Sequence, residues 1–263
     1  MVNWSRIKGI LVQEYYITKR SLEVLVDLPL FSFIGLILFG FITNFLSISN
    51  KTNEPKYLLL GLILWEVIRI TQYSMSVEAM WNVWSRNLSN MFVSPLTIWD
   101  YFIAQMISSV SKTIIIVLVI SVISYFMFSF NLLSVGMLNL LIYFINLTIF
   151  AWTTGILILG FIFRFGTRIQ SLAWGIIFLF QPLTAAAFPL SVLPKPLQTF
   201  ALIFPPTYIF EASRQSLNNG STNWGYVNTA FILNVFYFII AIVVFYFLFK
   251  KSKDTGQFAR NEG

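Results

Sequence analysis

Six long stretches of apolar residues constrain this chain more than any other feature. They lie at 28–48, 57–79, 101–127, 136–163, 170–191 and 226–249. The shortest has 21 residues and would extend about 31 Å as an α-helix, which is enough to cross the hydrocarbon core of a bilayer. The runs 113–120 and 241–248 lack the alternation of apolar and polar residues that β-barrel strands need. The sequence therefore predicts an all-α integral membrane protein with six spans.

The composition excludes several classes of function. Only 10% of the residues are charged, whereas a soluble domain carries about 25%, so we exclude a soluble enzyme, a disordered chain and a typical nucleic-acid binder. The chain has no Cys and no His, which removes thiol nucleophiles, disulfides and the usual zinc ligands. We therefore expect no catalytic residues, no metal site and no nucleic-acid partner.

The distribution of positive charge predicts the orientation. With the N-terminus inside, 11 of the 17 Lys and Arg residues fall on the inner side, four on the outer side and two within predicted spans. The outer four are Lys51, Lys56, Lys195 and Arg214, and the two within spans are Arg69 and Lys112. Positive charge accumulates in cytoplasmic segments. We expect a multi-pass protein of the plasma membrane with both termini in the cytoplasm.

The first 26 residues precede the spans and have a mixed character. Apolar residues recur there at helical spacing, at Trp4, Ile7, Leu11, Tyr15, Leu22 and Val26, with polar residues over much of the rest. This pattern is typical of a helix that lies in the headgroup plane. We predict an interfacial helix over 1–26, the alternative being an ordinary charged tail.

The second span is too polar for a helix that faces lipid. Glu66 and Arg69 lie three residues apart on one face, where they can pair across a helical turn. A charge at the bilayer centre costs about 3 kcal/mol on insertion scales, so we expect these groups to face the protein interior or a water-filled path. Two interpretations stay open: a structural ion pair between helices, or a pair that lines or gates a transport pathway.

Lys112 has two possible positions. It lies near mid-membrane if the third span is 101–127, and it reaches the inner boundary if the span is 113–133. A lysine at the boundary extends its ammonium group to the polar surface. We favour the boundary position.

The segment 82–95, between the second and third spans, predicts a short helix on the inner surface. Trp84, Leu88 and Met91 are spaced to share one face, and an exposed apolar face indicates a docking site. The alternative is a helix that tryptophans anchor at the interface. Ser94 and Pro95 read as an N-cap and a first helical residue, so we expect the third spanning helix to begin there.

The segment 182–206 holds six of the nine prolines. Between them, residues 197–204 are apolar but too short to span. A short apolar helix between proline breaks predicts a re-entrant hairpin in the outer leaflet. Its marker residues are Pro182, Phe188, Pro189, Pro194, Pro205 and Pro206. Just beyond it, Glu211 and Arg214 lie three residues apart, and we expect a local ion pair on the outer side.

These features together resemble the membrane permease subunits of type 2 ABC exporters. The resemblance covers essentially the whole chain, 1–263, as one permease domain, and its best-matching parts are residues 84–96 and the run from Pro182 to Arg214. It implies a complex of two permeases and two ATPase subunits. It also implies that 82–95 is the ATPase-docking element, with Trp84, Arg86, Asn87, Leu88, Met91, Ser94 and Pro95. Arg86 and Asn87 stand where many members carry a more acidic run, which leaves the details of docking open.

The expected function is export of an amphiphilic, glycan or lipid-type substrate, powered by a separate ATPase. Gly-Lys occurs nowhere in the chain, so it lacks the phosphate-binding loop with which an ATPase would hold its nucleotide. We therefore expect no cofactor here and name the ATPase, a second permease copy and lipid as partners.

A channel or secondary transporter is the alternative, although only one interrupted region is found where such transporters often have two. An intramembrane enzyme such as a lipid-linked transferase is disfavoured because the ten acidic residues are scattered.

Overall fold

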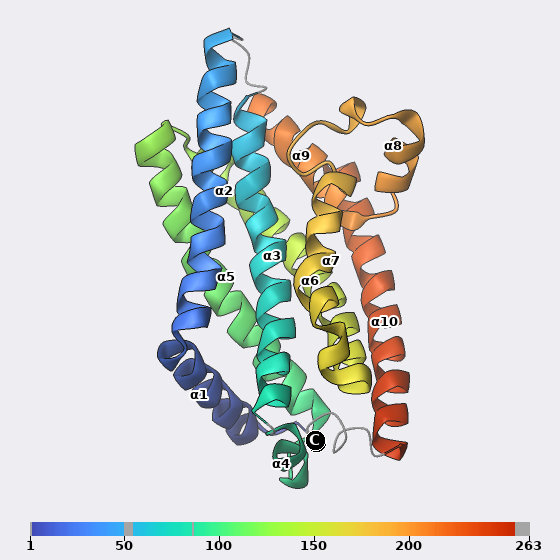
Figure 1. Ribbon diagram of the computed structural model, residues 1–263. Helices are drawn as coiled ribbons and strands as arrows, with labels where there is room; N and C mark the ends of the chain where they lie inside the picture. Colours follow the sequence, from blue (N-terminus) through green and yellow to red (C-terminus); the bar gives the residue numbers. More distant parts are fainter. Residues whose placement is uncertain (1, 50–54, 86, 256–263) are drawn as a thin grey trace.

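The computed structural model describes residues 2–49, 55–85 and 87–255. Within these ranges the chain forms a bundle of α-helices and no strand (Figure 1). The α-helices are α1 (Trp4–Arg20), α2 (Leu22–Ser49), α3 (Lys56–Trp84), α4 (Leu88–Val93), α5 (Ile98–Phe128), α6 (Met137–Phe165), α7 (Gln170–Leu183), α8 (Lys195–Ala201), α9 (Pro205–Asn219) and α10 (Trp224–Asp254). The short 3₁₀ helices are η1 (Leu132–Val135), η2 (Gly166–Ile169) and η3 (Leu190–Val192).

Five helices are long and apolar enough to cross a membrane: α2 from Leu25 to Ile48, α3, α5, α6 and α10. They match five of the predicted spans. The sixth, at 170–191, is not confirmed, because α7 has only 14 residues and extends about 21 Å. Pro182 lies in its last turn, and Ala185 then adopts a left-handed φ of 53°. The chain therefore leaves the helical path well before residue 191.

The central helix of the bundle is α3. In its most apolar 18-residue window 94% of the residues are buried, against 17–22% in α2, α5 and α10. The polar side chains of α3 therefore face protein, as expected from the cost of placing them in lipid. Thr71 shows how they are accommodated, since its hydroxyl hydrogen-bonds the hydroxyl of Thr113 in α5 at 2.8 Å.

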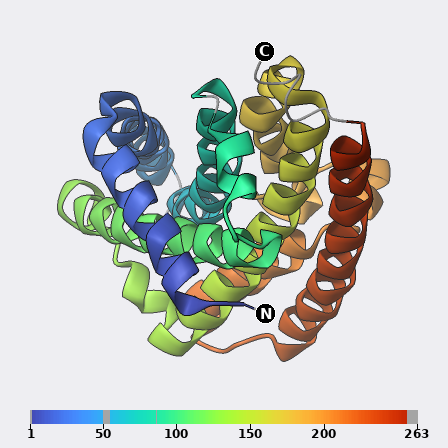
Figure 2. The same ribbon diagram turned by 90° about the horizontal axis from the view of Figure 1, so that it is seen from below.

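The two ends of the bundle carry different structures (Figures 1 and 2). At one end, α1 lies across the long helices beside α4, and α10 reaches this end on the opposite side of the bundle. We call this the α4 end. At the opposite end, which we call the α8 end, the chain from α7 passes through η3 and α8 before α9 begins.

The helix boundaries near α4 differ from those predicted. Residues 82–84 belong to α3, and the separate helix is only Leu88–Val93. Ser94 is the C-cap of α4, so the expectation that Ser94 and Pro95 open the next helix is wrong. Helix α5 begins at Ile98 because Thr97 and Asp100 form a capping box, in which each side chain accepts the other residue's backbone N–H.

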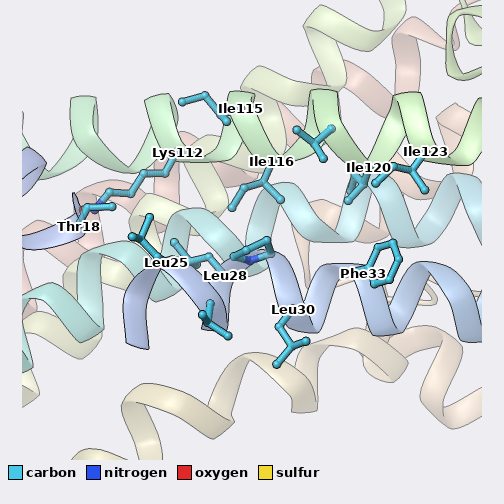
Figure 3. A pocket seen from close by; sticks show the side chains of 13 residues that line it. Thr18, Leu25, Leu28, Leu30, Phe33, Lys112, Ile115, Ile116, Ile120 and Ile123 are labelled. Carbon is cyan, nitrogen blue, oxygen red and sulfur yellow. The ribbon is translucent and has the colours of Figure 1, made fainter. Parts of the chain in front are cut away.

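The position of Lys112 also follows from the bounds of α5. The helix ends at Phe128, and Ser129 closes it in a left-handed conformation with a φ of 52°. A span over 113–133, which we favoured from the sequence, is therefore wrong as a helix. Lys112 instead lies near the middle of α5 and extends toward Thr18 at the C-terminal part of α1 (Figure 3).

Candidate functional site

The surface at the α4 end is built on α1. Ile7 and Ile10 of α1 are buried in the same apolar cluster as Met91 of α4, which is 9% exposed. Beside this contact lies a cavity of about 220 Å³. Its lining residues are Arg6, Gly9, Ile10, Gln13, Met91, Ser94, Pro95 and Leu96. Helices α1 and α4 therefore lie on either side of one small cavity.

The predicted apolar face of α4 is only partly available. Met91 is buried, so the expectation that it is exposed is wrong: it belongs to an apolar cluster that also holds Ile7 and Ile10 of α1. Trp84 is half-buried and packs edge-on against Trp81 at 5.1 Å between ring centroids. Val93, 87% exposed, is an apolar residue that α4 does present to the outside. Asn87 precedes α4 as its N-cap. Arg86 and the side chain of Leu88 lie outside the described residues.

Asp100 joins α1 to the start of α5. Its Oδ1 accepts the backbone N–H of Asn3 at 2.8 Å, and its Oδ2 lies 3.5 Å from Nη1 of Arg6. Because the same carboxylate caps α5 through Thr97, the first turn of α1 and the first turn of α5 are held by one side chain. A displacement of Asp100 would therefore disturb the first turn of both helices.

Glu14 is a buried group that sequence reasoning missed. It lies on the face of α1 that also carries Ile7 and Ile10, and it is 1% exposed. Gln105 of α5 donates to its Oε1 at 3.0 Å. Burial raises the pKa of this carboxyl, against the opposing effects of the positive charge of Lys112 and of the Gln105 hydrogen bond. The spacing of residues 7, 10 and 14 on one helical face could have indicated this buried position.

Glu66 and Arg69 form an ion pair within α3, and both side chains also contact α2. Nη2 of Arg69 lies 2.5 Å from Oε2 of Glu66, and the two residues are 4% and 3% exposed. Ser32 of α2 donates to the same carboxylate oxygen at 2.5 Å. Arg69 also donates to the carbonyl oxygen of Leu28 at 3.1 Å. The paired charges are satisfied within one chain.

Glu211 and Arg214 hold the turn that follows α7. Their side chains form a pair at 2.8 Å within α9. Arg214 also donates to the backbone carbonyls of Ala185 and Ala186, and Glu211 accepts the N–H of Leu190 at 2.7 Å. This pair therefore connects two segments, in addition to the local contact expected from its spacing.

The proline-marked residues take different positions around this turn. Pro182 is in the last turn of α7, and Phe188 and Pro189 are half-buried in the connection to η3. Pro194 precedes α8 as its N-cap. Pro205 and Pro206 occupy the first positions of α9, where a missing N–H costs no hydrogen bond.

The comparison with protein families identifies the chain. Residues 12–218 match the family described as ABC-2 type transporter. The chain belongs to this family. The match on this ABC-2 permease begins within α1, includes α4 and the Glu66–Arg69 pair, and ends in α9. The resemblance noted in the sequence is thereby confirmed, and the chain is a multi-pass membrane protein of the permease type. A search of curated proteins finds no match.

Proposed function

We propose that this ABC-2 permease is the membrane-spanning subunit of an ATP-driven exporter, with a separate ATPase bound at the α4 end. The observation that carries the proposal is the construction of that end. Helix α4 lies outside the spans, yet Met91 is buried in one apolar cluster with residues of α1, and Asp100 accepts a hydrogen bond from Asn3 at the start of α1. A partner bound at α4 would therefore lie next to α1 and to the first turn of α5.

The cargo is amphiphilic, of a glycan or lipid type, and two copies of the permease form the transporter. Family membership supports this arrangement, and the paired ATPases follow from the resemblance noted above. In one chain, Glu66 and Arg69 are already buried and mutually satisfied. That geometry favours their structural role over a role in lining the pathway, which would require both side chains to turn toward the second copy.

We place the α4 end in the cytoplasm. The charge distribution supports this orientation: Arg164, Lys251 and Lys253 lie in the last turns of α6 and α10, and positive residues concentrate on the cytoplasmic side. The α8 end then faces outward. In this orientation α7 and the turn after it complete a sixth crossing, which brings both termini to the cytoplasmic side.

A contact with α10 supports the re-entrant hairpin. Tyr237 donates from its hydroxyl to the carbonyl oxygen of Ile203 at 3.1 Å. Tyr237 lies 13 residues from each of Trp224 and Lys250, or about 20 Å from either along the helix. The turn between α8 and α9 therefore lies beside the middle of α10, at a depth where irregular backbone must be covered by protein.

The orientation gives a first prediction. The chain has no native cysteine, so single Cys residues can be introduced as labels. Lys253 is a suitable position because it is exposed. Its neighbour Ser252 is not suitable, because it is buried and donates to the carbonyl of Phe163. We expect a membrane-impermeant maleimide to leave Lys253→Cys unlabelled in intact cells and to label it after permeabilisation. A Cys at Val192, exposed near η3 at the α8 end, should be labelled without permeabilisation. The reverse pattern would overturn the orientation.

Docking at α4 gives a second prediction. Val93→Asp places a charge on the exposed end of α4 without touching the packed Met91. We expect it to weaken association with the ATPase at least tenfold, an effect of about 1.4 kcal/mol, measured by co-purification at graded ATPase concentrations. Val192→Asp is the control, because Val192 is 65% exposed at the opposite end. Equal ATPase recovery from both variants would remove α4 from the docking surface.

A further inference from the structure

One side of α1 is exposed along the whole helix in the part of the chain that the structure describes. Ile7, Ile10 and Glu14 lie on the opposite side, which packs against the bundle. Figures 1 and 2 show α1 on the outside of the bundle at the α4 end. We call the exposed side the outer face of α1, and its residues are Trp4, Ser5, Lys8, Gly9, Val12, Tyr15, Tyr16, Lys19 and Arg20.

Every charged side chain of the outer face is a cation. These side chains are Lys8, Lys19 and Arg20, and all three residues are exposed. The only carboxylate within α1 is that of Glu14, which is 1% exposed and accepts a hydrogen bond from Gln105 on the packed side. The outer face therefore carries positive charge and no negative charge of its own.

The acidic groups of the neighbouring helices are engaged inside the protein. Asp100 of α5 is buried and lies 3.5 Å from Arg6, which is not part of the outer face. Asp27 of α2 accepts a hydrogen bond from the hydroxyl of Tyr73 in α3 at 3.1 Å. The side chain of Glu23 lies outside the described residues. Among the described carboxylates of α1, α2 and α5, each thus has a partner within the bundle, and the outer face stays positive.

Large aromatic side chains alternate with the cations. Trp4 and Tyr15 are 65% and 60% exposed. Nζ of Lys19 lies 5.9 Å from the ring centroid of Tyr15, and the guanidinium carbon of Arg20 lies 5.5 Å from that of Tyr16. Exposed rings with a polar tip and long cationic side chains are typical of the boundary between membrane and water. The composition of the outer face therefore matches a bilayer surface.

The outer face continues into the exposed apolar surface of α2. Only Ser21 separates the two helices, and Leu22 is 77% exposed. The membrane-crossing part of α2 begins at Leu25. This is five residues after Arg20, or about 8 Å along a helix, a distance comparable with the depth of the lipid headgroup layer. Lys19 and Arg20 therefore lie where lipid phosphates lie, which favours lipid over a protein as their partner.

We propose that the outer face of α1 binds the headgroups of anionic phospholipids in the leaflet at the α4 end, with phosphates at Lys8, Lys19 and Arg20. A helix in the headgroup plane needs no particular lipid, whereas a face whose charges are all positive selects anionic lipid. The first turn of α1 and Glu14 are both hydrogen-bonded to α5, so lipid bound to α1 acts on α5. The proposal depends neither on which end is cytoplasmic nor on the ATPase.

The test measures which lipid lies beside the outer face. Val12→Cys, at the middle of the face and 46% exposed at Val12, carries a bimane fluorophore on the full-length permease in nanodiscs of dioleoyl-phosphatidylcholine. Spin-labelled phosphatidylglycerol or spin-labelled phosphatidylcholine, at the same low mole fraction, quenches the fluorophore according to its local concentration. One cation near the surface favours anionic lipid by about 1 kcal/mol, or about fivefold. We therefore expect phosphatidylglycerol to be favoured at least fivefold.

Charge removal at two places tests the assignment to α1. Lys8→Gln/Lys19→Gln/Arg20→Gln should remove the preference. The matched control is Lys250→Gln/Lys251→Gln/Lys253→Gln, which removes the same number of exposed cations from the last turns of α10 at the α4 end and should keep it. Equal quenching by both lipids before charge removal, or equal effects of the two triple variants, would overturn the proposal. So would a lack of quenching by either lipid, which would place the outer face in water or against a protein.

Discussion

Glu66→Gln is expected to destabilise the permease by about 3–5 kcal/mol, because breaking a buried ion pair leaves one charge uncompensated. In the native protein the Glu66 carboxylate accepts from both Arg69 and Ser32. Glutamine keeps one acceptor oxygen but turns an NH₂ group toward the guanidinium. The thermal unfolding midpoint, followed by tryptophan fluorescence in detergent, should fall by roughly 10 °C.

The double variant Glu66→Gln/Arg69→Met provides the control. It removes both charges, and replacing a whole buried pair by neutral side chains is often neutral or stabilising. We therefore expect it to recover much of the lost stability. A normal midpoint for Glu66→Gln would contradict the structural role. If Glu66→Gln assembled normally but transported poorly, the pair would belong to the pathway. If the variant assembled normally and also transported normally, both interpretations would be rejected.

Gly61→Ala is expected to have the next largest effect, because α3 contacts the turn after α7 at this position. A Cβ at residue 61 would lie 1.9 Å from the carbonyl oxygen of Ala186. Arg214 holds that carbonyl with a hydrogen bond of 2.9 Å, so the turn cannot yield without breaking it. Overpacking of this kind costs about 1–3 kcal/mol, and the unfolding midpoint should fall by roughly 5 °C.

Gly175→Ala is the matched control for this substitution. Gly175 lies in α7, and an added Cβ would meet nothing within 4 Å. Alanine is better than glycine in a helix by about 1 kcal/mol, so this variant should be as stable as the native protein or more so. A similar loss of stability in both variants would show that the close approach of α3 to the turn does not matter.

The spanning helices could be predicted because their signal is local. A run of about 20 apolar residues is sufficient evidence for a span, and the buried position of Glu66 and Arg69 follows from their cost in lipid. Helix α7 could not be predicted in the same way. Its apolar run continues past Leu183, but the chain departs there in a conformation that Arg214, 29 residues later, stabilises through the carbonyl of Ala185.

The details of the α4 end depended on contacts between distant segments. Ser94-Pro95 is a reasonable helix start, yet Thr97 and Asp100 provide two reciprocal hydrogen bonds, and Asp100 gains further partners in α1. Met91 was expected to be exposed because nothing in its own segment covers it. Its burial comes from an apolar cluster formed by residues distant in the sequence, among them Ile7 and Ile10 of α1.

The central claim is that this ABC-2 permease works with a separate ATPase. The most direct test is the composition and mass of the intact complex, purified in mild detergent from the cells that produce it. The account predicts equal amounts of the permease and an ABC-type ATPase, with a mass equal to two copies of each. A complex that carries out transport, contains this chain and lacks any ATP-hydrolysing subunit would contradict it.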